Sequence, residues 1–216
     1  LATRHARENL AEVTRALGDG GKIRVGVHVR RGDFVPASSR EAYRGRFNVA
    51  LPLEWYQHVC GEIVRVCGGG VRFVLVSDEP SDEIRRLVDR FGMATTWHLE
   101  HTDVSDLLTL AESDVVVCSV STYSVVAAWL SGGRYVWFRD HLQEHPGALS
   151  IWGHEETGGP TERNLAALAR RPPGSVRPRG VPLDSSEPLP EWFATRPEAD
   201  PATDLILYGA VPAAAG

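Results

Sequence analysis

Two arginines and an aspartate follow directly on a hydrophobic run, and this junction is the first place where the sequence could do chemistry. Residues 25–29 contain three valines, and Arg30, Arg31 and Asp33 come immediately after them. β-Branched runs of this kind are typical of buried strands. In open α/β sheets, ligands bind just beyond the carboxyl ends of the strands, where arginine can grip a phosphate or a carboxylate. The junction therefore predicts an anion-binding edge.

A second junction carries hydroxyl groups. Ser121, Thr122 and Tyr123 follow the apolar run 115–118 and precede a helical stretch. Free amides and hydroxyls at a helix N-terminus, with the helix dipole behind them, bind anions. Two arginines across the sheet edge from this turn would enclose a diphosphate from both sides. The two junctions together predict a pocket for a nucleotide sugar or another diphosphate.

Alternating strands and helices must position these groups. Five apolar runs are predicted as strands, with helical stretches between them, and they cover residues 22–29, 71–76, 95–99, 115–118 and 135–138. Such alternation gives a parallel sheet with right-handed crossovers. The predicted fold class is therefore α/β, with a doubly wound, Rossmann-like, five-stranded parallel sheet over residues 22–138. Residues 1–21 are expected to form a linking helix.

Residues 139–216 are expected to be a Pro-rich C-terminal extension packed on this domain. Nine prolines lie within residues 171–216, and this density excludes long regular elements. The same stretch keeps apolar residues that could dock on the sheet, namely Trp192, Phe193, Leu205, Ile206, Leu207 and Tyr208. We therefore expect an extended tail that lies on the domain and not a free linker.

The composition excludes several classes of protein. A chain of 216 residues with a net charge of -5 has no general basic face for nucleic acid. No apolar run reaches the length of a membrane span and no signal-peptide core is visible, so we expect a soluble, cytoplasmic protein. Cys60, Cys67 and Cys118 show neither zinc spacing nor a Cys-x-x-Cys motif. They are expected to be unpaired core residues.

Three of the candidate groups have simpler interpretations. The set His98, Glu100, His101 and Asp103 could imitate a metal site, but no supporting partner is identifiable and no metal site is predicted. Arg31 could pair with an acidic helix end. Asp78, which follows the second predicted strand, could cap the next helix.

At this point the motifs resemble a known family. The segment 28–33, His-Val-Arg-Arg-Gly-Asp, resembles the His-x-Arg-Arg-x-Asp signature of the α-1,2-fucosyltransferases, which α-1,6- and protein O-fucosyltransferases share in looser form. The stretch 106–130 is similar to a later motif of that family, and 73–78 is similar to its middle motif. Three motifs in the same order are more specific than any one of them. The resemblance covers roughly residues 25–130.

The resemblance implies roles for individual residues. Arg30 would grip the β-phosphate of the donor, and the implied catalytic residues are Arg30 and Asp33. Asp106 would read the guanine edge, because a carboxylate can accept two parallel hydrogen bonds from guanine. The full implied donor-binding set is His28, Arg30, Arg31, Asp78, Asp106, Ser121, Thr122 and Tyr123. The acceptor-activating base is left open among Asp33, Glu41, Asp78 and His101.

The implied reaction is transfer of L-fucose from GDP-β-L-fucose to a glycan acceptor with inversion, without a metal or another cofactor. The implied architecture is the C-terminal nucleotide-sugar domain of a GT-B glycosyltransferase. Two departures from the family pattern leave an alternative open: Val125 and Val126 replace a tryptophan pair, and only 27 residues precede His28. The alternative is a noncatalytic GDP-sugar binding module or a fragment that lacks its acceptor domain. A missing acceptor-side domain or a homo-oligomer would then complete the site.

Overall fold

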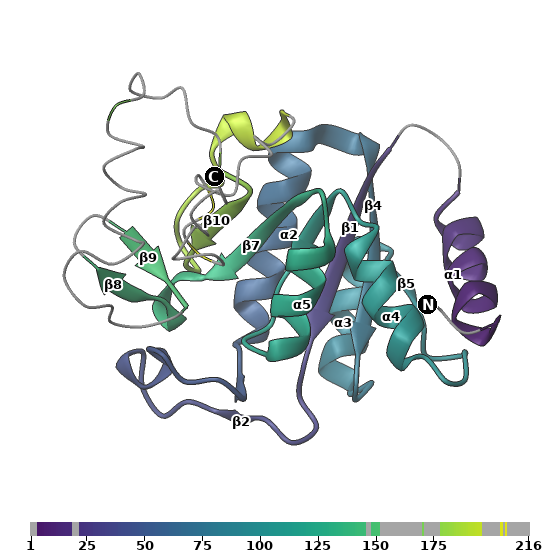
Figure 1. Ribbon diagram of the computed structural model, residues 1–216, viewed down its shortest axis with the longest axis horizontal. Coiled ribbons are helices and arrows are strands. Elements are labelled where there is room, and N and C mark those ends of the chain that lie inside the picture. The colour runs from purple at the N-terminus through teal and green to yellow at the C-terminus, as the bar shows by residue number, and fades with distance from the viewer. Residues whose placement is uncertain are drawn as a thin grey trace, which may run out of the picture.

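The core of the protein is a six-stranded parallel sheet (Figure 1). The computed structural model describes residues 4–18, 22–145, 148–151, 170, 178–195, 204 and 206. In spatial order the strands are β10 (Gly180–Leu183), β7 (Arg134–Phe138), β6 (Val115–Val117), β1 (Ile23–Val29), β4 (Val71–Ser77) and β5 (Ala94–Thr95). The predicted α/β class with a doubly wound parallel sheet is confirmed.

The central strand β1 explains why its sequence is so rich in valine. It pairs with β4 on one side and β6 on the other, so both of its edges are used. Val25, Val27 and Val29 are completely buried. A parallel strand that is covered on both faces needs apolar residues along its whole length.

Helices cover both faces of the sheet (Figure 1). On one face, α2 (Leu53–Cys67) and α3 (Asp82–Phe91) pack over the β1 valines in one core cluster. On the other face lie α1 (Arg4–Leu17), α4 (Asp103–Ala111) and α5 (Thr122–Leu130). Gly26 allows α4 to approach β1 closely, because a Cβ at this position would lie 2.8 Å from Ser113 Oγ and 2.9 Å from Leu110 Cδ2.

The strand order contains a reversal between β1 and β6. From β1 the chain moves outward through β4 to β5, and it then returns to the other side of β1 and moves outward through β6 and β7. Open α/β sheets bind ligands at such a topological switch point, outside the carboxyl ends of the strands. The register Val27↔Val117 and Val29↔Ser77 brings the residues after β1, β4 and β6 to one edge.

The strand predicted over residues 95–99 was wrong in extent. Strand β5 contains only Ala94 and Thr95, and the Leu99 amide then donates to the Thr96 carbonyl in a turn. As the edge strand, β5 has a hydrogen-bonded neighbour on one side only, β4. Two paired residues are therefore enough to complete the sheet before the chain turns toward α4.

The sheet also has one strand more than the five predicted. Residues Gly180–Leu183 of the Pro-rich stretch form β10 and pair with β7. Pro182 is tolerated because β10 is an edge strand, where one side of the backbone needs no partner. Two short antiparallel strands, β8 (Gln143–His145) and β9 (Ala148–Ser150), precede it along the chain.

Other parts of the C-terminal stretch also contact the domain. Phe193, in the short helix η4 (Glu191–Ala194), and Ile206 are buried, whereas Leu205, Leu207 and Tyr208 lie outside the described residues. Three backbone carbonyls at the end of α5 accept hydrogen bonds from Arg179, namely those of Ala128, Ser131 and Gly133.

The long loop 30–52 lies along the carboxyl edge of the sheet, at the bottom of Figure 1. It contains the short strands β2 (Val35–Pro36) and β3 (Val49–Ala50) and the short helix η1 (Glu41–Tyr43). Arg40 joins this loop to residues after β7 and β10 through ion pairs with Asp140 and Asp184. Among the described helices, none has both the length and the apolar character that a membrane span requires.

Candidate functional site

His28, near the end of β1, is the link between the two predicted junctions. Its Nδ1 lies 2.7 Å from Ser124 Oγ and 3.0 Å from Ser119 Oγ. Ser119 Oγ also contacts Ser121 Oγ at 2.9 Å. Burial lowers the pKa of His28 to about 4, so the ring is neutral at pH 7. The end of β1 is therefore bound to the turn between β6 and α5 through a buried, uncharged network.

Ser119 and Ser124 were not in the predicted donor-binding set, although the end of the fourth predicted strand places Ser119 at the same edge. Both side chains are buried, at 1% and 0% exposure, and both contact His28. The signal that could have found Ser124 is its spacing, because it lies three residues after Ser121, the residue that caps α5. The partnership with His28 depends on the pairing of β1 with β6, which a single sequence does not display.

The N-terminus of α5 offers free amide groups at this edge. Ser121 is the N-cap, and its hydroxyl accepts a hydrogen bond from the Ser124 amide at 3.2 Å. Within the described residues, the amides of Thr122 and Tyr123 have no hydrogen-bond partner. Thr122 is exposed and Tyr123 is half-buried. These two N–H groups can bind an anion, and the dipole of α5 favours it.

Asp78, directly after β4, holds the arginine loop in place. Its carboxylate accepts hydrogen bonds from the Arg31 amide at 2.9 Å and the Gly32 amide at 2.8 Å. It also pairs with Arg30 Nε at 3.2 Å. A Cβ at residue 32 would lie 2.6 Å from Asp78 Oδ2, so any residue other than glycine at this position would clash with the carboxylate. The interpretation of Asp78 as a helix cap was wrong, because Ser81 caps α3.

The side chain of Arg30 is fixed but still accessible. Its guanidinium contacts Asp33 Oδ1 at 3.0 Å and lies over the ring of Phe34. The side chain of Arg30 is 38% exposed, and that of Asp33 is 69% exposed. A cation held in this way by two carboxylates and a ring is oriented before any ligand arrives.

Arg31 differs from Arg30, although the two are adjacent. Its backbone amide is bound by Asp78, but its side chain forms no ion pair with any acidic residue in the described part of the chain. The expected alternative, pairing with an acidic helix end, is therefore not realised there. The side chain instead lines a separate cavity, together with residues of α2 and α3.

Asp106, in the first turn of α4, is a buried carboxylate whose bonding is incomplete. It is 8% exposed, and within the described residues its Oδ1 has no hydrogen-bond partner. Burial raises the pKa of Asp106 to about 6, and the polar side chains of Thr96 and Thr102 oppose this effect. A buried acceptor without a donor costs free energy and calls for an explanation. A ligand with N–H or O–H groups could donate the hydrogen bond that Asp106 Oδ1 lacks.

Tyr123 connects the Asp106 region to His28. The ring of Tyr123 lies 5.0 Å from that of His28, and its hydroxyl donates to the Asp103 carbonyl at 2.6 Å. Burial raises the pKa of Tyr123, and the nearby carboxylates of Asp106 and Asp103 raise it further. One aromatic side chain thus connects the end of β1, the start of α5 and the start of α4.

Other predicted neighbours are not in direct contact. In the part of the chain that the structure describes, the Arg30 side chain forms no hydrogen bond with Ser121, Thr122 or Tyr123, and His28 provides the link between β1 and the turn that contains them. His98 pairs with Glu12 of α1 at 2.9 Å. Across the described ranges, no group of three or more His, Cys, Asp or Glu side chains is arranged to hold a metal ion. The set that could have imitated a metal site therefore does not assemble.

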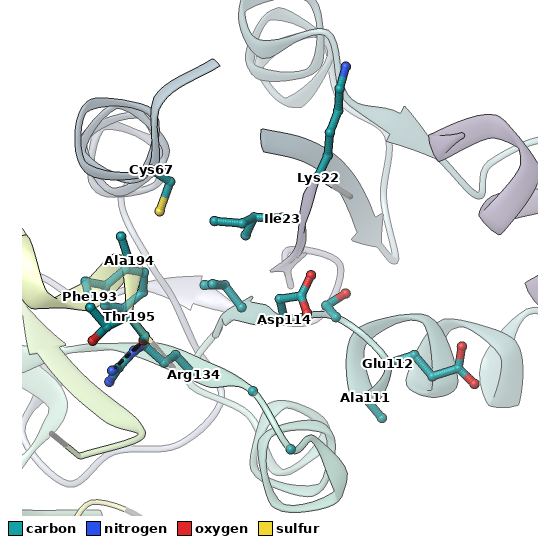
Figure 2. A pocket seen from close by; sticks show the side chains of 14 residues that line it. Lys22, Ile23, Cys67, Ala111, Glu112, Asp114, Arg134, Phe193, Ala194 and Thr195 are labelled. Atoms are coloured by element: carbon teal, nitrogen blue, oxygen red, sulfur yellow. Dashed lines mark hydrogen bonds between the residues drawn. The ribbon is translucent and has the colours of Figure 1, made fainter. Parts of the chain in front are cut away.

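A cavity of about 790 Å³ opens at the opposite, amino edge of the sheet (Figure 2). Ile23, Val115 and Arg134, the first residues of β1, β6 and β7, contribute to its lining. Arg134 is engaged there with the Thr195 carbonyl at 2.8 Å. None of the predicted site residues reaches this cavity. The carboxyl edge is therefore the candidate site.

The comparison with protein families agrees with the motifs. The model of the family described as glycosyl transferase family 11, the α-1,2-fucosyltransferase family, matches residues 3–142. The chain belongs to this family. The match includes every residue of the clusters around His28, Arg30 and Asp106, and it supports glycosyl transfer of the fucosyltransferase type. No curated protein matches this glycosyltransferase significantly.

Proposed function

We propose that this glycosyltransferase transfers L-fucose from GDP-β-L-fucose to a glycan acceptor with inversion at the anomeric carbon. The observation that carries the proposal is the convergence at the β1/β6 switch point. A fixed but accessible arginine, a helix N-terminus with two free amides and an unsatisfied buried carboxylate share one edge of the sheet. The arginine and the two amides suit the diphosphate of a guanosine diphosphate sugar, and the buried carboxylate suits its guanine base.

Asp106 is the proposed reader of the guanine base. Guanine presents two neighbouring N–H donors on one edge, and a carboxylate can accept both in parallel. Within the described residues, the buried Oδ1 of Asp106 has no hydrogen-bond partner, and we assign the N–H donors of guanine to it. Tyr123 is near both this carboxylate and His28, so its ring lies between the groups that we assign to the base and those that we assign to the diphosphate.

Arg30 and the start of α5 are the proposed diphosphate-binding groups. The guanidinium gives charge-assisted hydrogen bonds to phosphate oxygens, and the amides of Thr122 and Tyr123 add neutral donors. Asp33 and Asp78 hold the guanidinium in position. The Arg31 amide is held by Asp78 in this loop, and His28 and Ser121 belong to the buried hydrogen-bond network at the start of α5.

The chemistry follows from this arrangement. An acceptor hydroxyl attacks the anomeric carbon of fucose while the bond from that carbon to the β-phosphate oxygen breaks, and GDP leaves with the electron pair. Arg30 stabilises the negative charge that develops on the departing diphosphate. The proton of the acceptor hydroxyl passes to a carboxylate, and Asp33, the most exposed of those around Arg30, is the proposed acceptor of that proton.

The test of donor binding is calorimetric titration of GDP into wild type, Arg30→Ala and Arg72→Ala. Arg72, an exposed residue of β4, is the matched control because it has the same charge and contributes nothing to the carboxyl edge. Loss of charge-assisted hydrogen bonds costs about 1.5–3 kcal/mol, or about 10- to 150-fold in Kd. We expect this loss for Arg30→Ala alone. Equal GDP affinity in all three proteins would show that the pocket assignment is wrong.

Turnover separates an enzyme from a binding module. GDP release from GDP-fucose is measured with a panel of glycans as acceptors, and the product linkage is read by NMR. Release that depends on a glycan supports transfer, and an α-linked product from the β-linked donor supports inversion. Tight GDP binding without turnover on the whole panel would instead favour a noncatalytic GDP-sugar binding module.

A further inference from the structure

A second concavity lies next to the arginine loop, on the other face of the sheet from α4 and α5. Its volume is about 310 Å³, and its walls are formed by Arg31, by Glu54 and Gln57 of α2, and by Glu83 and Arg86 of α3. Pockets that hold small ligands begin at about 300 Å³. The first turns of α2 and α3 both lie at the carboxyl edge, so this cavity opens on the same edge as the donor site.

The charged side chains that line this cavity are not paired with one another. In the described part of the chain, none of the four charged wall residues, Arg31, Glu54, Glu83 and Arg86, takes part in an ion pair. Two cations and two anions balance, so the cavity has no net preference for a charged ligand. Carboxylates and guanidinium groups that do not bind one another remain free to bind neutral hydroxyl groups.

The floor of the cavity has a different character. Tyr43 and Leu51 line it and are both buried, at 7% and 1% exposure. An apolar floor below polar walls suits a ligand with one C–H face and a rim of hydroxyls. A sugar ring has this composition, and a volume of about 310 Å³ has room for about one or two such rings.

The arginine loop separates this cavity from the donor site. Asp78 binds the backbone of Arg31 and Gly32, so the two neighbouring arginine side chains have different surroundings. Arg30 contacts Asp33 and Asp78, whereas Arg31 lines the cavity. A ligand in the cavity therefore lies one residue away from the group that is proposed to hold the donor β-phosphate.

We propose that this cavity is the acceptor subsite and that it holds the end of a neutral glycan. The inference rests on the proposed function, because it names where the second substrate of that reaction binds. Glu54, Glu83, Arg31 and Arg86 bind the hydroxyls of the glycan, and the apolar floor supports one face of its terminal ring. Specificity for the acceptor is then a property of α2 and α3, which take no part in donor binding.

The test uses the double variant Glu54→Gln/Glu83→Gln, with Asp82→Asn/Asp89→Asn as the control. The control removes two charges as well, and both of its sites are exposed positions of α3 outside the cavity. Binding of neutral oligosaccharides on a glycan array is measured with GDP present, and GDP affinity is measured separately by calorimetry. Neither readout requires turnover.

We expect the cavity variant to lose at least about 10-fold in affinity for the glycans that wild type binds, because carboxylate–hydroxyl hydrogen bonds are lost. Its GDP Kd stays within about twofold of wild type, and the control binds both ligands normally. Equal glycan binding in the cavity variant, or no glycan binding by wild type that is saturated with GDP, would overturn the subsite. Failure of the donor site would appear separately, as wild type that does not bind GDP.

Discussion

Replacement of Asp106 by asparagine should make the protein more stable while it weakens GDP binding. The carboxylate is buried and incompletely hydrogen-bonded, so the folded protein holds its charge at a cost. Asparagine has nearly the same shape and no charge. The matched control is Asp103→Asn, an exposed residue in the same helical turn.

The size of the effect follows from the pKa of Asp106, which burial raises from an ordinary value of 3.8 to about 6. Because this folded pKa lies above the unfolded one, ionisation of Asp106 opposes folding at high pH and has no effect below about pH 4. A difference of about two pH units corresponds to about 3 kcal/mol, since each unit is worth about 1.4 kcal/mol. Asparagine removes this penalty.

The assay is urea unfolding of wild type and both variants at pH 7.5 and pH 4.0. The stability gain of Asp106→Asn over wild type should be about 2–3 kcal/mol greater at pH 7.5 than at pH 4.0, whereas Asp103→Asn should show a much smaller difference, because its charge is the smallest of the causes that raise the pKa of Asp106. GDP affinity of wild type should fall below about pH 6, as Asp106 becomes protonated. An equal stability gain at both pH values would refute the conclusion that ionisation of buried Asp106 destabilises the folded protein.

Two further predictions concern the arginine loop and the His28 network. Gly32→Ala should weaken GDP binding, because the added Cβ would lie 2.6 Å from Asp78 Oδ2. In the control Gly61→Ala, in α2, the added Cβ meets nothing within 4 Å and the helix should gain about 1 kcal/mol of stability. Calorimetry measures GDP affinity and urea unfolding measures stability, and normal GDP affinity in Gly32→Ala would contradict the role given to this loop. The contribution of His28 to stability should fall by up to about 3 kcal/mol between pH 7 and pH 4, because unfolded His28 takes up a proton near pH 6.5 and folded His28 only near pH 4; the contribution of Asp106 changes in the opposite direction. In His28→Gln this part of the pH dependence should be absent from urea unfolding, and an unchanged pH profile would show that His28 does not titrate in this way.

Most of the sheet could be predicted because its strands are buried on both faces. The apolar runs that became β1, β4, β6 and β7 are continuous, and glycines or polar turns bound them. The two errors in the sheet concern its edges. β5 needs only two paired residues, and β10 contains a proline that the unpaired side of an edge strand tolerates. Edge strands lack the continuous burial that makes central strands recognisable.

The sequence by itself determined which groups would stand at the carboxyl edge of the sheet. Arg30 and Asp78 follow buried strands directly and Ser121 comes shortly after another, and in a parallel sheet those ends must share one edge. Together with the ordered motifs, this was sufficient to indicate the fucosyltransferase family, which the family match bears out.

Only the tertiary structure decided what these groups do for one another. Asp78 binds two amides of the arginine loop across 46 and 47 residues of chain, and His28 binds Ser124 across 96 residues. Such contacts depend on strand order and register, which local residue patterns do not encode. The same holds for the cavity beside Arg31, because its walls come from a loop and two helices that meet only after the sheet has formed.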